Sequence, residues 1–588
     1  MRRLPLVLGI VASMACRPRK SAPPPPPVPA AGEASLPDDI DVDETFELIA
    51  APFPMVAITT VLRGSADGAS RLSLSRWGGV EHPEREVHGF GVTADDGSPL
   101  PASHDPETGW VVQHAPGTVL HVRYVLVSTQ YEVTSEAPSY YRPIIRPSLF
   151  HLIGQSGLLY PEWVPESTPV RIAVHWRGFK EAKWTVASSF GVDQDGFRTT
   201  RPFGDLRRAV FLAGAIRLKS RDVGGHPLVV ASAGTDWGFT DDDLVDLTAR
   251  IVGAEREFFH DFDWPYFLVS AIPVGVYRPG ASDYGGIGLT QSFALFLTPR
   301  FKLKSAPGSA GLPLLLAHEQ FHLWNGGRYR LADPQGLASW FSEGFTNFFA
   351  RRLLLRAGVI DLADYVANLN DEITLYLTSA VRNEPARRAA TDSRSDESRE
   401  KLPYLRGDVV AVLLDAEIRA RSQGARSLDD LMREAVAPRS PAPDVDSETF
   451  LALVARYTTP AFADGIRQVV LDGRTAIVPS TLLEPCLTAH TEMLAPFDLG
   501  FDFPGSQVAH EVVGVVPDSS AYRAGLRNGQ RITRFVAALG DSREPVELTV
   551  ESAAGQETFS YLPQGTSRIA VPVFAAKTPT VESCRAVL

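Results

Sequence analysis

The pattern of hydrophobic and polar positions divides the chain into parts in which the apolar residues are spaced differently. From about Phe46 to Leu218, short apolar runs are separated by Gly, Pro, Asp and Ser, as in Val119 to Val127 and Val170 to Trp176. Short apolar runs bounded by turn residues are typical of β-strands. Residues 43–225 are therefore expected to form an N-terminal β-sandwich domain.

Around Pro227 the pattern changes to one that predicts alternating strands and helices. Leu228–Ser232 and Tyr266–Val274 predict strands, and Thr240 with an Asp three residues later predicts a capped helix start between them. From Leu312 to about Val470 the apolar spacing is mainly helical. It is interrupted by the charge-dense stretch 382–401, which is expected to be a surface loop. Residues 226–480 are thus expected to form a mixed α/β and helical domain.

The last part of the chain, residues 490–578, returns to β texture, with a strand expected at Val512–Val516. Two cysteines, Cys486 and Cys584, flank it. A disulfide between them would close a loop of about a hundred residues and stabilise the fold by about 4 kcal/mol. Two unrelated thiols are the alternative.

The N-terminal residues predict export. Arg2 and Arg3 precede an apolar stretch, Leu4 to Ala12, and small residues ending in Cys16. This order is typical of a signal segment, and a Cys at its end resembles a bacterial lipobox. The Pro-rich residues 17–42 predict an extended linker. We expect an exported bacterial protein, periplasmic or at the cell surface, attached to a membrane only through lipid if Cys16 is modified.

The amino-acid composition limits the class of protein and its expected partners. With 44% hydrophobic and 21% charged residues, the 588-residue chain is typical of a protein with several globular domains. Its net charge is −12, and acidic and basic residues are interspersed. Because nucleic-acid binding depends on clustered Lys and Arg, we expect no nucleic-acid partner.

One segment with helical spacing contains candidate metal-binding residues. Residues 314–324 read LLLAHEQFHLW, in which His318 and His322 are four residues apart. Histidines at this spacing lie on one face of a helix and can bind one metal ion, while Glu319 between them reaches the remaining face. A catalytic zinc ion requires three protein ligands, and Glu343 supplies the third from the next apolar segment. The alternative for Glu343 is an ordinary carboxylate in the first turn of a helix.

These residue types predict peptide hydrolysis by zinc-activated water. One catalytic zinc ion would polarise the scissile carbonyl and lower the pKa of its water. Glu319 would then act as the general base, taking the proton from water and returning it to the leaving amine.

Three segments carry a resemblance to a known family: HEQFHLWN at 318–325, WFSEGFT at 340–346 and PYLRG at 403–407. They resemble the gluzincin metallopeptidases and, among them, the glycyl aminopeptidase family with a C-terminal PDZ domain. The resemblance implies a thermolysin-like zinc peptidase domain over residues 226–480, and Tyr404 as hydrogen-bond donor to the developing oxyanion. It implies aminopeptidase-like exopeptidase action on a peptide or protein substrate.

A Gly-rich segment departs from the family pattern. In Tyr284–Ser292, Gly285 and Gly286 match the strand that binds the substrate backbone in such aminopeptidases, but the acidic residue that holds the substrate amine is missing. Zinc endopeptidase action therefore stays an alternative. An alternative of another class is a catalytically inactive, surface-located adaptor that binds peptides.

The C-terminal part resembles a PDZ domain through Leu499, Gly500 and Phe501 and through AYRAGLRNG at 521–529. In PDZ domains such a loop binds the carboxylate of a C-terminal peptide. A purely structural β-domain is the alternative. The expected architecture is multidomain α+β: an N-terminal β-sandwich, a thermolysin-like mixed α/β plus helical catalytic domain, and a C-terminal PDZ-like β-domain.

Overall fold

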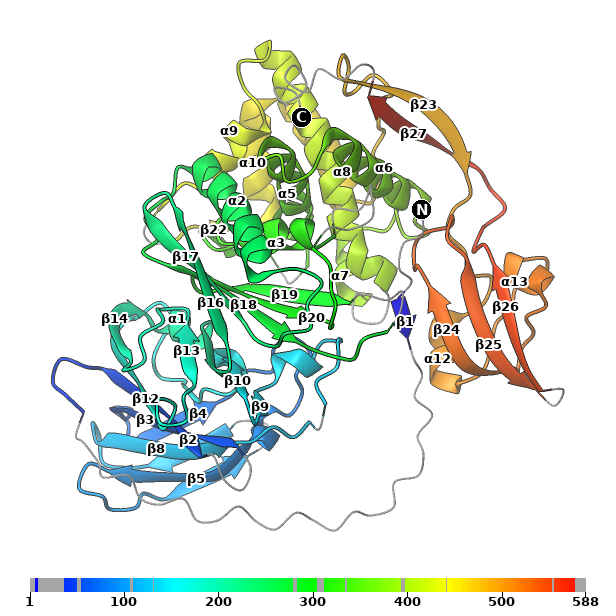
Figure 1. Cartoon of the computed structure of the whole chain (residues 1–588). Helices are drawn as coiled ribbons and strands as arrows, with labels where there is room; N and C mark the ends of the chain where they lie inside the picture. The colour runs from blue at the N-terminus through cyan, green and yellow to red at the C-terminus, as the bar shows by residue number, and fades with distance from the viewer. Residues whose placement is uncertain are drawn as a thin grey trace. The chain divides into compact units, whose positions relative to one another are not determined.

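The computed structural model describes residues 6–8, 36–49, 54–105, 109–130, 132–278, 283–303, 311–333, 336–392, 397–439, 442–552, 555–576 and 588. Figure 1 shows its helices and strands in chain order. The chain divides into two compact units. One is Lys20–Leu303, and the other joins Lys304–Leu588 with Met1–Arg19. The division falls inside the predicted peptidase domain, and the predicted domain boundaries stay predictions. None of the helices described is long and apolar enough to cross a membrane.

Three sheets share one apolar core in the first part of the Lys20–Leu303 unit. Phe46, Ile58, Trp110, Phe150 and Phe211 are buried together in this core. The largest sheet has six strands in the order β14-β12-β2-β3-β8-β5. Their bounds are β2 Val42–Ile49, β3 Met55–Arg63, β5 Val87–Ala94, β8 Val119–Leu126, β12 Pro169–Arg177 and β14 Phe197–Pro202.

Two four-stranded sheets complete this part, in the orders β13-β15-β10-β9 and β11-β4-β7-β6. The strands expected near residues 119–127 and 170–176 are confirmed as β8 and β12. The assignment of the whole part as a β-sandwich stays a prediction. The bounds are β4 Ala69–Ser73, β6 Ala102–Asp105, β7 Gly109–Gln113, β9 Ile144–Arg146, β10 Leu149–Ile153, β11 Tyr160–Pro161, β13 Thr185–Ser188 and β15 Val210–Gly214, with the short helix α1 at Phe203–Arg207.

The same unit ends in a five-stranded sheet with the order β16-β17-β18-β20-β19. Strands β17, β18 and β20 run parallel, and β19 pairs antiparallel at the edge. The expected helix is α2, Asp241–Phe259, and Thr240 and Asp243 form the predicted capping box. The strands are β16 Arg217–Val223, β17 His226–Ser232, β18 Phe267–Pro273, β19 Tyr284–Leu289 and β20 Ser292–Leu297.

The Lys304–Leu588 unit begins with a helical region. Its helices are α3 Gly311–Phe321, α4 Ser339–Ser342, α5 Gly344–Arg356, α6 Leu362–Thr378, α7 Ala386–Asp392, α8 Glu397–Ser422, α9 Leu428–Ala435, α10 Ser447–Tyr457 and α11 Pro460–Val470, and the short strands β21 Arg330–Leu331 and β22 Asp444–Val445 pair between them. The prediction of a surface loop over 382–401 is wrong, because α7 and the start of α8 lie there. Ala, Glu, Arg and Lys are good helix formers, so a charge-dense stretch can also be the solvated face of a helix.

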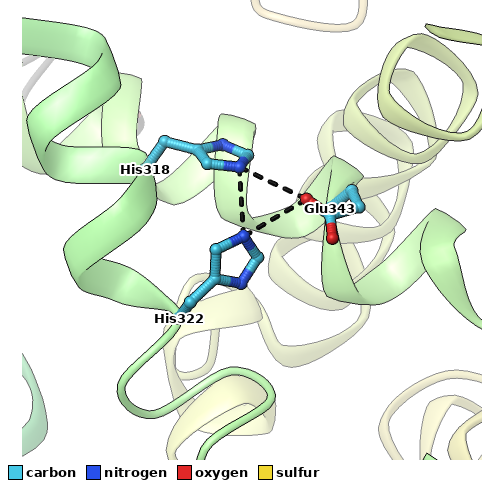
Figure 2. Close-up of side chains that lie close together, drawn as sticks. All are labelled: His318, His322 and Glu343. Carbon is cyan, nitrogen blue, oxygen red and sulfur yellow. Dashed lines mark hydrogen bonds and ion pairs between the residues drawn. The ribbon is translucent and has the colours of Figure 1, made fainter. Parts of the chain in front are cut away.

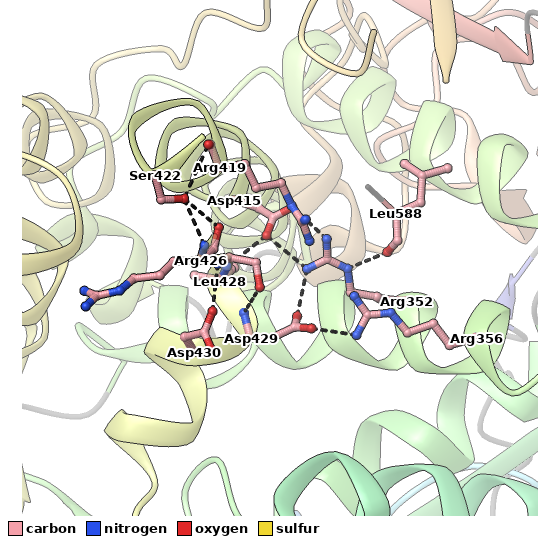
Figure 3. A network of polar contacts seen from close by, with 11 residues as sticks. Arg352, Arg356, Asp415, Arg419, Ser422, Arg426, Leu428, Asp429, Asp430 and Leu588 are labelled. Atoms are coloured by element: carbon pink, nitrogen blue, oxygen red, sulfur yellow. Dashed lines mark hydrogen bonds and ion pairs between the residues drawn. The ribbon is translucent and has the colours of Figure 1, made fainter. Parts of the chain in front are cut away.

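Buried ion pairs hold α5 against α8 and α9 (Figure 3). Arg352 is 1% exposed, and its guanidinium pairs with Asp415 at 2.6 Å and with Asp429 at 3.0 Å. Its Nε donates to the main-chain oxygen of Leu588. The preceding residue of the same helix, Arg351, forms a bidentate pair with Asp408, both bonds 2.6 Å long. Buried, bidentate pairs have a fixed geometry, so these contacts set the position of α5 relative to α8.

The C-terminal part has a small core around Phe501, Leu526 and Phe535. Strands β24, β25 and β26 form its sheet, and β23 pairs with β27 in a separate ribbon. The bounds are β23 Leu487–Leu494, β24 Arg531–Ala537, β25 Val546–Ser552, β26 Gly555–Tyr561 and β27 Ile569–Ala576, with helices α12 Phe503–Ala509 and α13 Ser520–Ala524.

Two findings in this part differ from expectation. The predicted strand Val512–Val516 is wrong: these residues are not assigned to a strand, and Gly514 interrupts the segment with φ +67°. The preceding residue, Glu511, forms an isolated bridge with Arg531. Leu6–Leu8 form a short strand, β1, paired with the edge of β24, within the segment predicted as an export signal. An open strand edge pairs readily with any extended chain.

Three expectations about the ends of the chain are not decided by these residues. Cys486 is buried, whereas Cys584 and Cys16 lie outside the described residues. The disulfide, the lipid and the export signal therefore stay predictions.

Candidate metal centre

Helix α3 presents the two histidines. It begins at Gly311, and its buried side chains include Leu312, Leu316 and Phe321, which anchor it in the helical region. The ring of Phe321 stacks on Phe349 of α5 at a centroid distance of 5.2 Å. This packing holds His318 on a defined face of α3, with His322 one turn further along, just beyond the helix end.

The third side chain comes from the junction of α4 and α5. Glu343 lies between Ser342, the last residue of α4, and Gly344, the first of α5. Its Oε2 is 3.3 Å from Nε2 of His318 and 3.2 Å from Nε2 of His322, and the two Nε2 atoms are 3.1 Å apart (Figure 2). The predicted convergence of these three side chains is observed.

This donor set fits zinc. Ligand atoms about 2.0–2.1 Å from a tetrahedral ion are about 3.3–3.4 Å from one another. The three observed separations, 3.1, 3.2 and 3.3 Å, come close to the edges of such a tetrahedron. Two imidazoles and one carboxylate leave a fourth position for water or substrate, as in catalytic zinc sites.

Both imidazoles are oriented by acceptors that the sequence analysis did not identify. Nδ1 of His318 donates to Oδ1 of Asn347 at 2.7 Å, and Nδ1 of His322 donates to the main-chain oxygen of Asn325 at 3.1 Å. Because both acceptors are oxygens without a proton, Nδ1 carries a hydrogen in each ring, and Nε2, which faces Glu343, is the nitrogen that could bind a metal ion. Asn347 lies four residues after Glu343, which places the two on one face of α5, and this spacing is a signal that the sequence contained.

The charges of the site are strongly coupled. Burial disfavours the protonated form of His322, but the Glu343 carboxylate, assisted by Glu319, outweighs this effect and raises the pKa of His322 to about 9. Burial also opposes ionisation of Glu343, and the two histidines outweigh it and hold the pKa of Glu343 well below its usual value. Without metal the site is therefore an ion pair between a carboxylate and an imidazolium.

This coupling predicts pH-dependent metal binding. Since His322 without metal keeps its proton up to about pH 9, zinc must displace that proton at neutral pH. We expect release of about one proton per zinc ion at pH 7.5 and an affinity that rises with pH towards about pH 9. The pKa of His322 is higher in the folded protein than in the unfolded chain. Protonated His322 therefore stabilises the metal-free fold at pH 6, and this contribution is lost as the pH rises through about 9. Calorimetry in two buffers of different ionisation enthalpy measures the released proton, and release of none would contradict the assignment.

Tyr404 and Glu319 lie beside this centre. Glu319 follows His318 on α3, and the ring of Tyr404 on α8 lies nearly parallel to that of His318 at 6.0 Å between centroids. Burial and the negative charges of Glu343 and Glu319 raise the pKa of Tyr404 well above its usual value. The hydroxyl therefore remains protonated at neutral pH and is available as a donor.

Two glycines bring α8 close to Glu343. A side chain on Gly407 would overlap the main-chain oxygen of Trp340, and one on Gly344 would overlap the backbone of Gly407. The backbones of the α4–α5 junction and of α8 are thus in contact at Gly344 and Gly407. Gly344 directly follows Glu343, and Gly407 lies three residues after Tyr404. The PYLRG segment therefore contains both Tyr404 and the glycine, Gly407, that allows α8 to pack closely against the α4–α5 junction.

The predicted substrate-binding glycines lie on β19 of the Lys20–Leu303 unit, paired with β20. A side chain on Gly285 would overlap the hydroxyl of Tyr140, and one on Gly286 would overlap the ring of Phe293. A side chain at either position would therefore have to displace a neighbouring aromatic side chain of the same unit. Their role in substrate binding stays a prediction.

The predicted peptide-binding loop, Leu499 to Phe501, belongs to the C-terminal part. Gly500 adopts φ +75°, and its N–H donates to Oδ1 of Asp498 at 2.8 Å. This N–H is already paired with a carboxylate of the same chain. Binding of a peptide carboxylate by the loop stays a prediction.

Comparison with known proteins places the site in a class. Residues 312–404 match the family model of the M61 glycyl aminopeptidase, and this range contains His318, Glu319, His322, Glu343 and Tyr404. A search of curated proteins found no match. Among solved structures, the chain resembles an aminopeptidase N family protein from Idiomarina loihiensis at 17% identity and a TM-score of 0.69, covering 93% of this chain and 100% of that one. An M1 zinc metallopeptidase from Deinococcus radiodurans aligns at 15% identity and a TM-score of 0.47, covering 75% of this chain and 96% of that one.

The family match over residues 312–404 and the three converging side chains together indicate a zinc metallopeptidase. Within that class its catalytic segment is similar to the M61 glycyl aminopeptidases, and the fold as a whole is similar to the aminopeptidase N family protein. The alternative of a catalytically inactive, peptide-binding adaptor stays an alternative that a measurement of hydrolysis decides.

Proposed function

We propose that this protein hydrolyses peptide bonds with one zinc ion held by His318, His322 and Glu343, and that it acts as an aminopeptidase-like exopeptidase. The convergence of these three side chains, with separations of 3.1–3.3 Å, is the observation that supports the proposal most strongly. A bound zinc ion supplies Lewis acidity for the scissile carbonyl and lowers the pKa of water towards neutrality.

The chain's own residues supply the remaining steps. Glu319, next to His318 on α3, accepts the proton of the attacking water and returns it to the leaving amine. The Tyr404 hydroxyl, which remains protonated at neutral pH, donates a hydrogen bond to the oxygen on which negative charge develops. Asn347 and the main-chain oxygen of Asn325 keep the imidazole rings oriented throughout.

Residues outside the metal centre are proposed to determine where the protein is located and how it binds peptides. We place the protein outside the cytoplasm on the basis of residues 1–16 and the Pro-rich linker, with lipid on Cys16 as its membrane attachment. Gly285 and Gly286 are proposed to line the path of the substrate backbone. The C-terminal part is proposed to be a PDZ-like domain that binds a C-terminal peptide through Leu499, Gly500 and Phe501.

A second candidate, endopeptidase action, is favoured by one observation. Gly288 stands where the related aminopeptidases have the acidic residue that holds the substrate amine, so a free ammonium lacks that partner here. A charge-assisted hydrogen bond of this kind contributes about 1.5–3 kcal/mol.

Paired peptides distinguish the two modes. We expect the protein to cleave a peptide with a free N-terminus and to leave its N-acetylated counterpart intact, because exopeptidase action requires the free amine. Cleavage sites are identified by mass spectrometry, and a sample treated with chelator is the control. Equal cleavage of both peptides, at an internal bond, would establish an endopeptidase instead.

A further inference from the structure

Asn325 lies at the centre of a buried hydrogen-bond network next to the metal centre. It is 1% exposed and follows His322 by three residues, beyond the end of α3. Its Nδ2 donates to the main-chain oxygens of Phe341 and Ser342, each at 3.0 Å, and approaches Oγ1 of Thr346 at 2.9 Å. These acceptors belong to the last two residues of α4 and the first turn of α5, which flank Glu343.

The other groups of Asn325 face its own segment. Oδ1 accepts a hydrogen bond of 2.6 Å from the hydroxyl of Tyr329, and the main-chain oxygen accepts one of 3.1 Å from Nδ1 of His322. One residue therefore contacts a histidine of the donor set directly and also binds the two residues that precede Glu343. Among the described residues, Asn347 makes the comparable connection for His318.

The network requires an amide at this position. Three oxygen atoms face Nδ2. One of them, the main-chain oxygen of Ser342, also accepts a hydrogen bond of 2.6 Å from Oγ1 of Thr346. A carboxylate in place of the amide would turn a negative oxygen towards them, in a buried place where unpaired polar groups are costly. An alanine would leave acceptors without their donor.

We propose that Asn325 is a positioning residue that sets the distance between the two histidines and Glu343, and thereby the affinity for zinc, without touching the ion. The inference rests on the proposed function, because it concerns zinc bound by those three ligands. Residues that orient metal ligands from behind typically change metal affinity 10–100-fold when they are replaced.

Zinc affinity of the full chain, measured by competition with a chromophoric chelator, tests the inference. We expect Asn325→Ala and Asn325→Asp to weaken zinc binding about 10–100-fold relative to wild type. Asn370→Ala is the matched control, since Asn370 on α6 bonds to the main chain of Phe574 and contacts none of the three side chains of the donor set; its zinc affinity is expected to stay close to that of wild type. Thermal unfolding of the metal-free variants reports the effect on the fold separately.

Each outcome decides between explanations. A folded Asn325→Ala protein that binds zinc as tightly as wild type would overturn the inference while leaving the proposed function intact. A wild-type protein that binds no zinc would overturn the proposed function itself. If the Asn325 variants do not fold, Thr346→Val replaces them: it removes one acceptor of the network, and zinc affinity equal to that of wild type would then count against the inference.

Discussion

Replacing Glu319 by Gln is expected to lower kcat for peptide hydrolysis by about 10²–10⁴-fold, the usual contribution of a general base. Gln has nearly the same shape as Glu but cannot accept a proton. His318, His322 and Glu343 are unchanged in this variant, so zinc should remain bound at one ion per chain. The measurement is steady-state hydrolysis together with metal analysis of the same protein.

The matched control is Glu417→Gln. Glu417 is a partly exposed residue of α8 that pairs with Arg421, and its loss should leave kcat unchanged. Hydrolysis by Glu319→Gln within about threefold of wild type, with zinc retained, would refute the assignment of the base.

Gly407→Ala is expected to affect both stability and catalysis. The new methyl group would overlap the main-chain oxygen of Trp340, and a rigid backbone cannot move aside as a side chain can. Overpacking of a close contact typically costs about 1–3 kcal/mol of unfolding free energy, so the melting temperature should fall by several degrees. Because α8 must move away from Glu343, Tyr404 should lose its alignment and kcat should fall as well.

Tyr404→Phe separates the two effects. It removes the hydroxyl without forcing the helices apart, so the melting temperature should change little. Loss of one oxyanion donor typically lowers kcat about 10²–10³-fold. If Gly407→Ala kept wild-type kcat and stability, the close crossing would not matter for the site; full turnover by Tyr404→Phe would remove this residue from the mechanism.

The convergence of the three side chains was predictable from sequence because it follows from short-range geometry. The four-residue spacing of His318 and His322 determines that both lie on one helix face, whatever the rest of the chain does. Glu343 was predictable because a zinc site needs a third ligand and the next apolar helical segment carried an acidic residue. The helix start at Thr240 followed in the same way from a local capping box.

What the sequence did not reveal depends on contacts between distant segments. Asn325 and Asn347 are ordinary polar residues until the fold places them against the histidines. The role of Gly407 depends on the crossing of α8 with the α4–α5 junction, which no local pattern contains. The stretch 382–401 was misassigned because charge density is compatible both with loops and with the exposed face of a helix such as α8.

The zinc content of the purified protein and its relation to hydrolysis test the central claim most directly. The account predicts one zinc ion per chain, loss of peptide hydrolysis when a chelator removes it, and recovery of hydrolysis on return of one equivalent. His322→Ala should abolish both binding and recovery. Peptide hydrolysis that persists in the metal-free protein, or a folded wild-type protein that binds no zinc, would contradict the account.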